Sequence, residues 1–499
     1  MFENKYKRFD NMKKISIIFP DIIGNIAPEI YGHFSEHIGG VIYGGIWVGK
    51  DSDIPNIKGW RKDFIEKFKK INPPVLRWPG GCFAETYHWR DGIGENRPTR
   101  PNWWGFVDGK YEPNEVGTHE FMDLCEILNT KPYFAVNITS ITPMEARDWM
   151  DYCLSPRGAT TLALEREANG HPEPFDIPYW GVGNENWGDG GNMTPDYYAL
   201  EYRRFAAVLN NLKRKEDKLF VGGANAADYF WTHDVCQNLS TAKYTKFDGL
   251  TYHFYARPGV EGIDFDENGW NTIIEVANKM DYLIKRNYAI AQGFGLEKNM
   301  KLVVDEWGCW YKWGSGPSKG KNLFEQQSTV RDAVVSALTL NIFNNNCDKV
   351  QMANVAQVCN NLHALFLADE NNFIETPTYY VFDMFKGHQG GNALKTVVSN
   401  NAELENSVSV SSSIKDDVLT ITLANLSCKD DAEISLDLLG NNREITSSYC
   451  VILQGKNITD YNTFENPHTV IPECERSIDI TKPLTLPKAS VMLIKTNFK

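Results

Sequence analysis

The stretch IPYWGVGNENWG, residues 177–188, decides the fold: a short apolar run ends in a Gly-rich turn that carries Asn184 and Glu185. A second stretch of this design, KLVVDEWG at residues 301–308, carries Glu306 near its end. Short apolar runs bounded by turns are typical of buried strands, and barrels built from such strands place their functional side chains where the strands end. Both stretches therefore indicate strands that lead into a site.

Six more runs of this kind lie between residues 30 and 357. In chain order, the eight runs are IYGHFSEH (30–37), PVLRWPGG (74–81), KPYFAVNI (131–138), IPYWGVGNEN (177–186), KLFVGGA (218–224), FDGLTYHFY (247–255), KLVVDEWG (301–308) and KVQMANVAQ (349–357). Segments with helical periodicity lie between them, for example residues 60–71, 119–128 and 195–215. This alternation predicts an α/β fold with a (β/α)8 TIM barrel, although periodicity alone also allows an open doubly wound sheet.

The positions of the polar residues favour the barrel over the open sheet. The candidate functional residues lie at the carboxyl ends of the runs, where barrels build their active sites. They are Glu36, Cys82, Asn184, Glu185, His253, Tyr255, Glu306 and Gln357.

From about residue 385 the sequence changes to alternating apolar and polar residues, as in VSVSSSI (408–414), DVLTITLANL (417–426) and ASVMLIKT (489–496). This two-residue period, interrupted by Ser, Thr, Asn and Asp turns, predicts a C-terminal antiparallel β-sandwich. We therefore expect a catalytic barrel at residues 25–384 and a β-sandwich domain at residues 385–499. The strand-like segment 13–24 precedes the barrel, and we expect it to join the sandwich.

The composition limits the classes of partner. The 499-residue chain has a formal net charge of -13 and a sequence pI near 5.4, and its basic residues are dispersed. This pattern argues against nucleic acid or an anionic membrane as a partner. Many of the 14 tryptophans lie in Gly-rich sequence such as WPGG and ENWG. Although most tryptophans in a protein belong to its core, flat rings beside polar groups suit the faces of a neutral sugar.

The cysteines and the N-terminal region bear on the compartment. The ten cysteines are scattered without a CxxC motif, which is typical of reduced thiols in the cytosol. The apolar run in MKKISIIFPDII (12–23) is broken by Pro20 and Asp21, so it is too short for a signal peptide. No stretch approaches membrane-spanning length. We expect a cytoplasmic protein.

Glu185 and Glu306 are the residues on which a chemical prediction rests. Hydrolysis of a glycoside with retention needs a nucleophilic carboxylate and a carboxylic acid roughly 5 Å apart. The ends of the fourth and seventh strands of one barrel can supply that separation, and the Asn184 amide can reach a sugar hydroxyl beside the anomeric carbon. The alternative is that both glutamates cap helices or pair with arginines. Their aromatic, Gly-rich surroundings favour catalysis.

Four motifs carry a resemblance to a known family. They are GHFSEHIGG (32–40), LRWPGGCFAETYHWRDGIG (76–94), YWGVGNENWGDGGNMTP (179–195) and VVDEWG (303–308). They resemble the intracellular α-L-arabinofuranosidases of glycoside hydrolase family 51. The resemblance implies a (β/α)8 barrel with a C-terminal β-sandwich, retaining exo-action on terminal α-L-arabinofuranosyl groups of oligosaccharides, and a homo-oligomer, commonly a hexamer.

The resemblance also implies roles for individual residues. Glu185 matches the family's acid/base and Glu306 its nucleophile. The positions that match substrate-binding residues, or resemble pocket positions, are Glu36, Cys82, Asn184, His253, Tyr255, Trp310 and Gln357. Many family members have Asn at the position of Cys82, and a thiol is a weaker hydrogen-bond donor than an amide. We therefore expect a looser contact with the sugar there, unless Cys82 is a small buried filler.

No metal or other cofactor is predicted. His33 and His37 are four residues apart in a strand-like context, without an HExxH motif. The sequence GVG at 181–183 lacks the third glycine of a dinucleotide fingerprint.

Three other functions remain open at this point. A β-xylosidase or endo-glucanase of the same clan would differ in turning over a pyranoside. A non-catalytic carbohydrate-binding protein would bind sugar without turnover. A structural or interaction protein would bind a partner through the sandwich.

Overall fold

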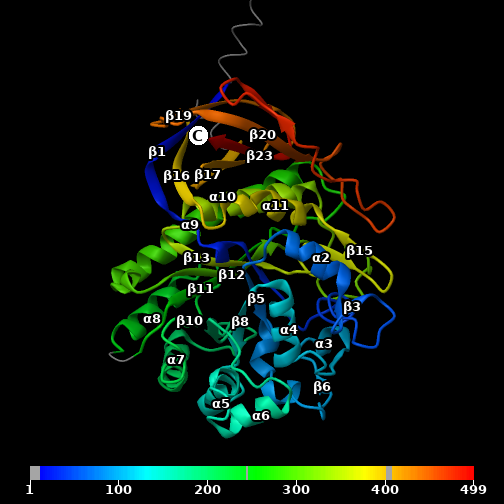
Figure 1. Cartoon of the computed structure of the whole chain (residues 1–499), viewed down its shortest axis with the longest axis vertical. Helices are drawn as coiled ribbons and strands as arrows, with labels where there is room; N and C mark the ends of the chain where they lie inside the picture. Colours follow the sequence, from blue (N-terminus) through cyan, green and yellow to red (C-terminus); the bar gives the residue numbers. More distant parts are fainter. Residues whose placement is uncertain (1–11, 243–244, 400–406) are drawn as a thin grey trace, which may run out of the picture.

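The computed structural model describes residues 12–242, 245–399 and 407–499. Eight parallel strands form a closed barrel, and a nine-stranded sheet lies beyond one side of it along the long axis of the molecule (Figure 1). In barrel order the strands are β2 (Gly32–Phe34), β5 (Val75–Trp78), β8 (Lys131–Val136), β9 (Tyr179–Val182), β10 (Lys218–Val221), β11 (Gly249–Ala256), β12 (Lys301–Cys309) and β13 (Val350–Ala356). Each of the eight predicted runs overlaps one of these strands, and β11 and β12 each extend one residue beyond their run, so the predicted fold class is confirmed.

Helices follow the barrel strands and form most of its outer layer (Figure 1). Their bounds are α2 (Lys62–Lys70), α3 (Gly105–Asp108), α4 (Thr118–Leu128), α5 (Pro143–Leu154), α6 (Thr161–Ala168), α7 (Pro195–Leu209), α8 (Tyr229–Ser240), α9 (Glu267–Gly293), α10 (Val330–Asn345) and α11 (Pro377–Phe385). The predicted helix at 195–215 ends six residues early. Its last buried apolar residue is Leu209, and a turn begins at Asn210. The predicted residues beyond Leu209 have no buried apolar side chain whose packing would stabilise a longer helix.

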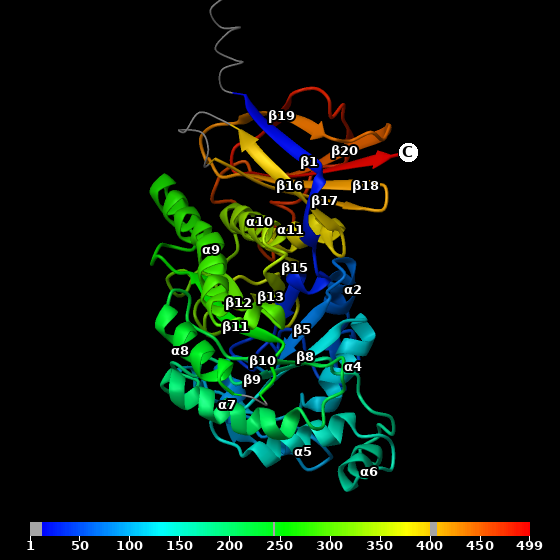
Figure 2. The same cartoon turned by 90° about the vertical axis from the view of Figure 1, so that its left-hand side faces the viewer.

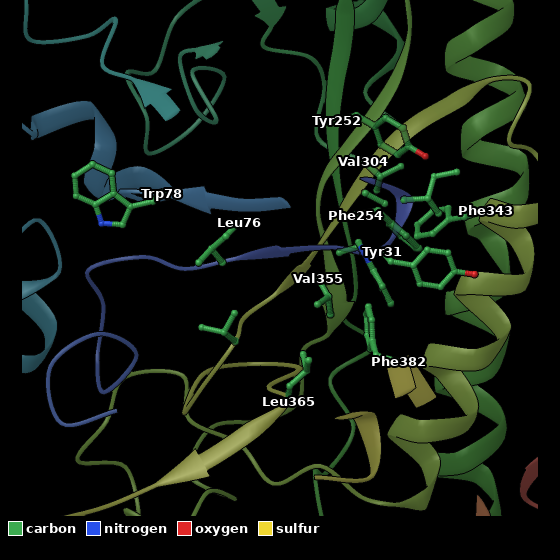
Figure 3. Close-up of a cluster of buried hydrophobic side chains, with 14 of the residues drawn as sticks. Tyr31, Leu76, Trp78, Tyr252, Phe254, Val304, Phe343, Val355, Leu365 and Phe382 are labelled. Atoms are coloured by element: carbon green, nitrogen blue, oxygen red, sulfur yellow. The ribbon is translucent and has the colours of Figure 1, made fainter. Parts of the chain in front are cut away.

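The barrel has two packed surfaces. Inside, one cluster of buried side chains comes from six different strands, so these side chains fill the interior. Its members are Val75, Tyr133, Tyr179, Phe220, Val303 and Met352. Outside, Val304 of β12 and Val355 of β13 lie near Phe343 of α10 and Phe382 of α11 (Figure 3). Strand residues thus alternate between the interior and the helical layer, which fixes the direction in which each end residue points.

The C-terminal sheet contains β1 (Lys13–Asn25), which pairs with β16 (Asn392–Ser399) on one side and β19 (Ala432–Leu439) on the other. All pairs are antiparallel except β1 with β19, which is parallel. The other strands are β17 (Val408–Lys415), β18 (Val418–Asn425), β20 (Ile445–Gln454), β21 (Arg476–Ser477), β22 (Leu484–Leu486) and β23 (Ser490–Phe498). Strands from both ends of the sheet share one apolar core, so the sheet folds over on itself (Figure 2). The boundary between residues 384 and 385 stays a prediction.

The loops of the barrel contain short two-stranded ribbons. They are β3 (Asn56–Ile57) with β4 (Trp60–Arg61), β6 (Arg100–Pro101) with β7 (Tyr111–Glu112), and β14 (Phe366–Ala368) with β15 (Phe373–Glu375). Helix α10 lies between barrel and sheet and is buried almost all round, as expected of a helix with two apolar neighbours. Within the described ranges, none of the helices has the length and apolar character needed to cross a membrane.

Candidate active site

One cavity at the carboxyl ends of the barrel strands gathers most of the predicted site. Of the nine predicted residues, eight line it: Glu36, Cys82, Asn184, Glu185, Tyr255, Glu306, Trp310 and Gln357. The ninth, His253, lies against two of these residues, Glu185 and Glu306. Residues more than 300 positions apart in the sequence therefore meet because the closed barrel brings all its strand ends to one rim.

Glu306 lies on β12 and is held as an anion. The Arg77 guanidinium donates from Nη1 to Oε1 of Glu306 at 2.8 Å, and the Tyr255 hydroxyl donates to Oε2 at 2.7 Å. Burial by itself would raise the pKa of Glu306, but His253 and Arg77 hold it below the ordinary value. The result is a buried, ionised carboxylate with a fixed orientation.

A local irregularity of β12 lets two neighbouring carboxylates face the same arginine. Between Val304 and Trp307, three steps along β12 oppose only two along β13, so β12 carries an extra residue there. Asp305 consequently lies 3.5 Å from Nε of Arg77, while Glu306 lies at its Nη1. In a regular strand the two side chains would point to opposite faces.

Glu185 follows β9, with its backbone in the left-handed region at φ 45°. The ring nitrogen Nδ1 of His253 lies 2.8 Å from Oε1 of Glu185 and 3.5 Å from Oε2 of Glu306. One oxygen of Glu185 and one of Glu306 lie within 4.8 Å of each other. Burial alone would lower the pKa of His253, but Glu306 and Glu185 raise it overall, which favours the charged imidazolium beside the two carboxylates.

Glu36 is a third carboxylate that lines the cavity. Its carboxylate accepts hydrogen bonds from the backbone N–H of Phe83 at 3.1 Å and the indole of Trp104 at 2.9 Å. Gln357 accepts the backbone N–H of Glu36 at 2.9 Å and donates to its carboxylate at 3.3 Å. Burial, followed by the charge of Glu306, raises the pKa of Glu36 to about 7. A side chain at Gly81 would displace this carboxylate, because a Cβ there would lie 2.4 Å from Oε2 of Glu36.

Glu85 is a buried carboxylate that ties two strand ends together. It accepts the backbone N–H of Asn184 at 2.6 Å and the side-chain amide of Asn186 at 3.1 Å. Its other oxygen accepts the backbone N–H groups of Ile138 and Thr139, each at 2.9 Å. Burial raises the pKa of Glu85 to about 7, although these four donors favour its ionised form.

Cys82 and Asn184 lie beside the two central carboxylates. The Cys82 thiol is 3.6 Å from Oε2 of Glu185, and the Asn184 amide donates to its sulfur at 3.7 Å. Oδ1 of Asn184 accepts from Nη2 of Arg77 at 2.6 Å, which fixes the amide so that its N–H2 group faces the cavity side. Burial, together with nearby carboxylates, raises the pKa of Cys82 well above its ordinary value, so the thiol stays protonated.

Two groups of side chains are close enough to hold a metal ion within the described part of the chain. One is Glu185, His253 and Glu306, and the other is the buried set Cys309, Asp332 and His363. His37, by contrast, binds Glu112 through Nδ1 at 2.9 Å and accepts the Trp78 indole N–H at 2.9 Å, while His33 packs on Phe68. The absence of a metal therefore stays a prediction that depends on experiment.

Sequence reasoning missed Arg77, Glu85, Trp104 and Asp305. Arg77 offered a signal, because a charged residue within the otherwise apolar run PVLRW needs a buried partner. Glu85, in a 3-10 turn, and Trp104, in a loop, had no such signal, since their partners lie on other elements. Asp305 enters the site only through the irregularity in β12.

The fold and site define a barrel glycoside hydrolase: a (β/α)8 barrel with a close pair of carboxylates after its fourth and seventh strands. Family models agree. Residues 67–268 match the model described as "Alpha-L-arabinofuranosidase 1 domain", and residues 305–490 match "Alpha-L-arabinofuranosidase C-terminal domain". The chain belongs to the α-L-arabinofuranosidases of glycoside hydrolase family 51.

Individual relatives span nearly the whole chain. An intracellular exo-α-L-arabinofuranosidase of Bacteroides ovatus is 38% identical over 94% of this chain and 93% of its own length. The crystal structure of the GH51 arabinofuranosidase from Xanthomonas axonopodis pv. citri has a TM-score of 0.90 at 35% identity, covering 97% of this chain and 100% of that one. The α-L-arabinofuranosidase from Thermotoga maritima in complex with arabinose has a TM-score of 0.84 at 28% identity, with the same coverage.

Proposed function

We propose that this protein is a retaining exo-α-L-arabinofuranosidase that releases terminal arabinofuranosyl groups from arabinose-containing oligosaccharides. The observation that carries the proposal is the separation of Glu185 and Glu306, whose nearest oxygens lie within 4.8 Å. Retaining glycosidases have carboxyl groups about 5–5.5 Å apart, whereas inverting enzymes need about 6.5–9.5 Å to admit a water. The family relationship supports the furanose specificity.

In the first step, a carboxylate oxygen of Glu306 attacks the anomeric carbon. The bond from that carbon to the leaving oxygen breaks as Glu185 transfers its proton to that oxygen. Arg77 and Tyr255 keep Glu306 ionised and oriented for attack. The side chain of Glu185 is 19% exposed, so it can reach a leaving group at the cavity mouth.

In the second step, Glu185 is a carboxylate and takes a proton from water. The water oxygen attacks the anomeric carbon, the ester to Glu306 breaks, and Glu306 leaves as a carboxylate. The covalent intermediate has no negative charge on Glu306, so His253 then interacts mainly with Glu185. Two displacements at one carbon return the original configuration.

The other cavity residues bind the sugar in this proposal. Glu36, when ionised, accepts sugar hydroxyls, and the free amide hydrogens of Asn184 and Gln357 donate to them. The cavity volume is ≈ 50 Å³. That is room for roughly four water molecules, a scale that suits one sugar ring entering from a chain end more than a long glycan lying across the site.

We also propose that the protein is a cytoplasmic homo-oligomer, and that a hexamer is its principal form. The cysteine pattern and the relative named as intracellular support the compartment. The resemblance to the family supports the assembly. Light scattering coupled to gel filtration tests the oligomer, and a monomer at micromolar concentration would contradict it.

The experiment that tests the function compares aryl α-L-arabinofuranoside, β-D-xyloside and β-D-glucoside as substrates. We expect turnover of the arabinofuranoside alone, and loss by roughly 10³-fold or more in Glu306→Ala. Azide should restore product formation in that variant, since it can replace the missing nucleophile. Turnover confined to a pyranoside would assign a different specificity within the clan, and sugar binding without turnover would identify a carbohydrate-binding protein.

A further inference from the structure

We propose that Asp305 is a positioning residue that keeps the Arg77 guanidinium paired with a negative charge while Glu306 is esterified. The inference rests on the proposed function, in which Glu306 is the nucleophile. Asp305 is buried and is not among the side chains that line the sugar cavity, so it acts through Arg77 and not on the substrate. Because esterification removes the negative charge of Glu306, Arg77 needs a second partner of opposite charge in the covalent intermediate.

Arg77 has two carboxylate partners within ion-pair distance among the residues that the structure describes. Its Nη1 donates to Glu306 at 2.8 Å, and its Nε lies 3.5 Å from Oδ2 of Asp305. The remaining nitrogen, Nη2, donates to the neutral Asn184 amide at 2.6 Å. A guanidinium does not lose its proton in proteins, so the buried charge of Arg77 persists through every step. Of the two carboxylates, Asp305 alone keeps its charge once Glu306 is an ester.

The negative charge that leaves Glu306 appears on a residue that Arg77 does not pair with. As an oxygen of Glu306 bonds to the anomeric carbon, the bond to the leaving oxygen breaks, and that oxygen takes the proton of Glu185. His253 lies 2.8 Å from Glu185 and 3.5 Å from Glu306, so it faces a carboxylate before and after the step. Within the described ranges, Arg77 forms no ion pair with Glu185. An unpaired buried cation is costly, so the intermediate depends on Asp305.

Two neutral donors hold the Asp305 carboxylate in place. The Tyr133 hydroxyl donates to Oδ2 at 2.8 Å, and the Asn354 amide donates to Oδ1 at 3.0 Å. Burial, together with the charge of Asp305, raises the pKa of Tyr133 well above its ordinary value, so the phenol remains a donor. Asp305 thus faces Arg77 as a fixed charge at 3.5 Å, while the guanidinium keeps its hydrogen bond to Glu306.

Asp305→Asn should affect the two chemical steps differently. The variant keeps the shape of the side chain and removes its charge. Ester formation then leaves Arg77 without a carboxylate partner, so glycosylation slows. Deglycosylation returns a carboxylate to an unpaired guanidinium and should not slow. We expect the ratio of the glycosylation rate constant to the deglycosylation rate constant to fall roughly 10- to 100-fold, the effect of losing one interaction with a charged group.

The two steps can be followed separately in Glu185→Ala with a dinitrophenyl α-L-arabinofuranoside. The burst of dinitrophenolate reports glycosylation, because this leaving group needs no proton, and the slower release that follows reports deglycosylation. Adding Asp305→Asn to this variant should slow the burst without lowering the later rate. Equal slowing of both phases, or no change in either, would overturn the role of Asp305 and leave the proposed function intact. If Glu185→Ala itself gives neither a burst nor an adduct, the proposed function fails, and the inference with it.

The fold should tolerate Asp305→Asn. The buried Oδ1 of Asn354 has no hydrogen-bond partner among the described residues, so it can accept from the new amide once the Asn354 side chain turns. If the variant is nevertheless unstable, Asp305→Ser gives the same comparison, because it also removes the charge and leaves a hydroxyl near Tyr133.

Two control variants separate the charge of Asp305 from its packing. Tyr133→Phe removes a hydrogen bond but keeps the charge before and after esterification, so the ratio of rate constants should stay within roughly 3-fold of its original value. A change as large as that of Asp305→Asn would overturn the role of the charge. Asp217→Asn removes another buried aspartate, which accepts from Arg214 at 2.7 Å just before β10. It should leave the ratio unchanged.

Discussion

The carboxylate of Glu85 accepts the backbone N–H of Asn184 at 2.6 Å, one residue before Glu185. The same carboxylate accepts the side-chain amide of Asn186, so it holds the residues on both sides of the proposed acid/base. Because Glu185 has a left-handed backbone conformation, its direction depends on such external support. Glu85 is thus placed to position a residue that it does not touch.

Glu85→Gln should impair proton donation more than it impairs the fold. A glutamine at this position would direct an N–H2 group toward N–H donors that need an acceptor. This mismatch should lower the free energy of unfolding by about 1–3 kcal/mol. We expect kcat/KM to fall more for methyl α-L-arabinofuranoside than for a dinitrophenyl α-L-arabinofuranoside, because only the methyl substrate has a leaving group that needs a proton in order to depart. Glu120→Gln removes another buried carboxylate, one bound to Arg97, and should show no such dependence. Equal losses on both substrates would leave Glu85 with a structural role alone.

Glu185→Ala should divide substrates by leaving group. Loss of a general acid costs about 10²–10⁴-fold where the departing oxygen needs a proton. We expect kcat/KM to fall by this factor for an arabinose-containing oligosaccharide. For a dinitrophenyl α-L-arabinofuranoside we expect a much smaller fall in kcat/KM. Glu126→Ala, at an exposed position of α4, is the control. If both substrates suffer alike, Glu185 is not the acid.

Arg77→Lys should lose activity although it keeps the charge. The guanidinium of Arg77 contacts Glu306, Asn184 and Asp305 through three nitrogens, and one ammonium group cannot reach all of them. Losing one hydrogen bond to a charged group predicts about a 10- to 100-fold lower kcat. If the Arg77→Lys variant kept the wild-type kcat, the forked arrangement of the guanidinium nitrogens would be dispensable for catalysis. Arg77→Met leaves buried carboxylates unpaired and should lower stability by about 3–5 kcal/mol.

The pKa of Glu36 predicts a pH dependence of stability. It is raised from 4.5 to about 7 by burial and by Glu306, so the folded state holds a proton that the unfolded state releases. The unfolding free energy contributed by Glu36 should therefore fall as pH rises from 4.5 to about 7, by roughly 3 kcal/mol. Denaturant unfolding of wild type and Glu36→Gln across this range measures it. The difference between the two should shift with pH, and a constant difference would refute the raised pKa.

Chelation should leave activity unchanged, because the proposed chemistry uses only carboxylates, and Arg77 and His253 already compensate the charge of Glu306. Dialysis against EDTA followed by the arabinofuranosidase assay checks this. A loss of activity that zinc or another divalent ion restores would direct attention to Glu185, His253 and Glu306 as ligands.

The sequence predicts the barrel because each barrel strand corresponds to an apolar run that ends in a polar turn. It predicts the end of α7 less well, since the helix stops where tertiary burial stops, after Leu209. Residues at strand ends, such as Glu185 and Tyr255, could be found because a barrel brings all strand ends together. Glu85 and Trp104 could not, because their roles exist only through partners on distant elements. The parallel pairing of β1 with β19 could not be predicted either, because the two strands are far apart in the sequence.

The central claim is that Glu306 forms a covalent bond to arabinose, and mass spectrometry tests it most directly. Glu185→Ala incubated with a dinitrophenyl α-L-arabinofuranoside should accumulate the intermediate, because the first step needs no proton and the second lacks its base. We predict a single pentosyl adduct on the peptide that contains Glu306. An adduct on another residue, or release of product through attack by water with no adduct at all, would contradict the claim.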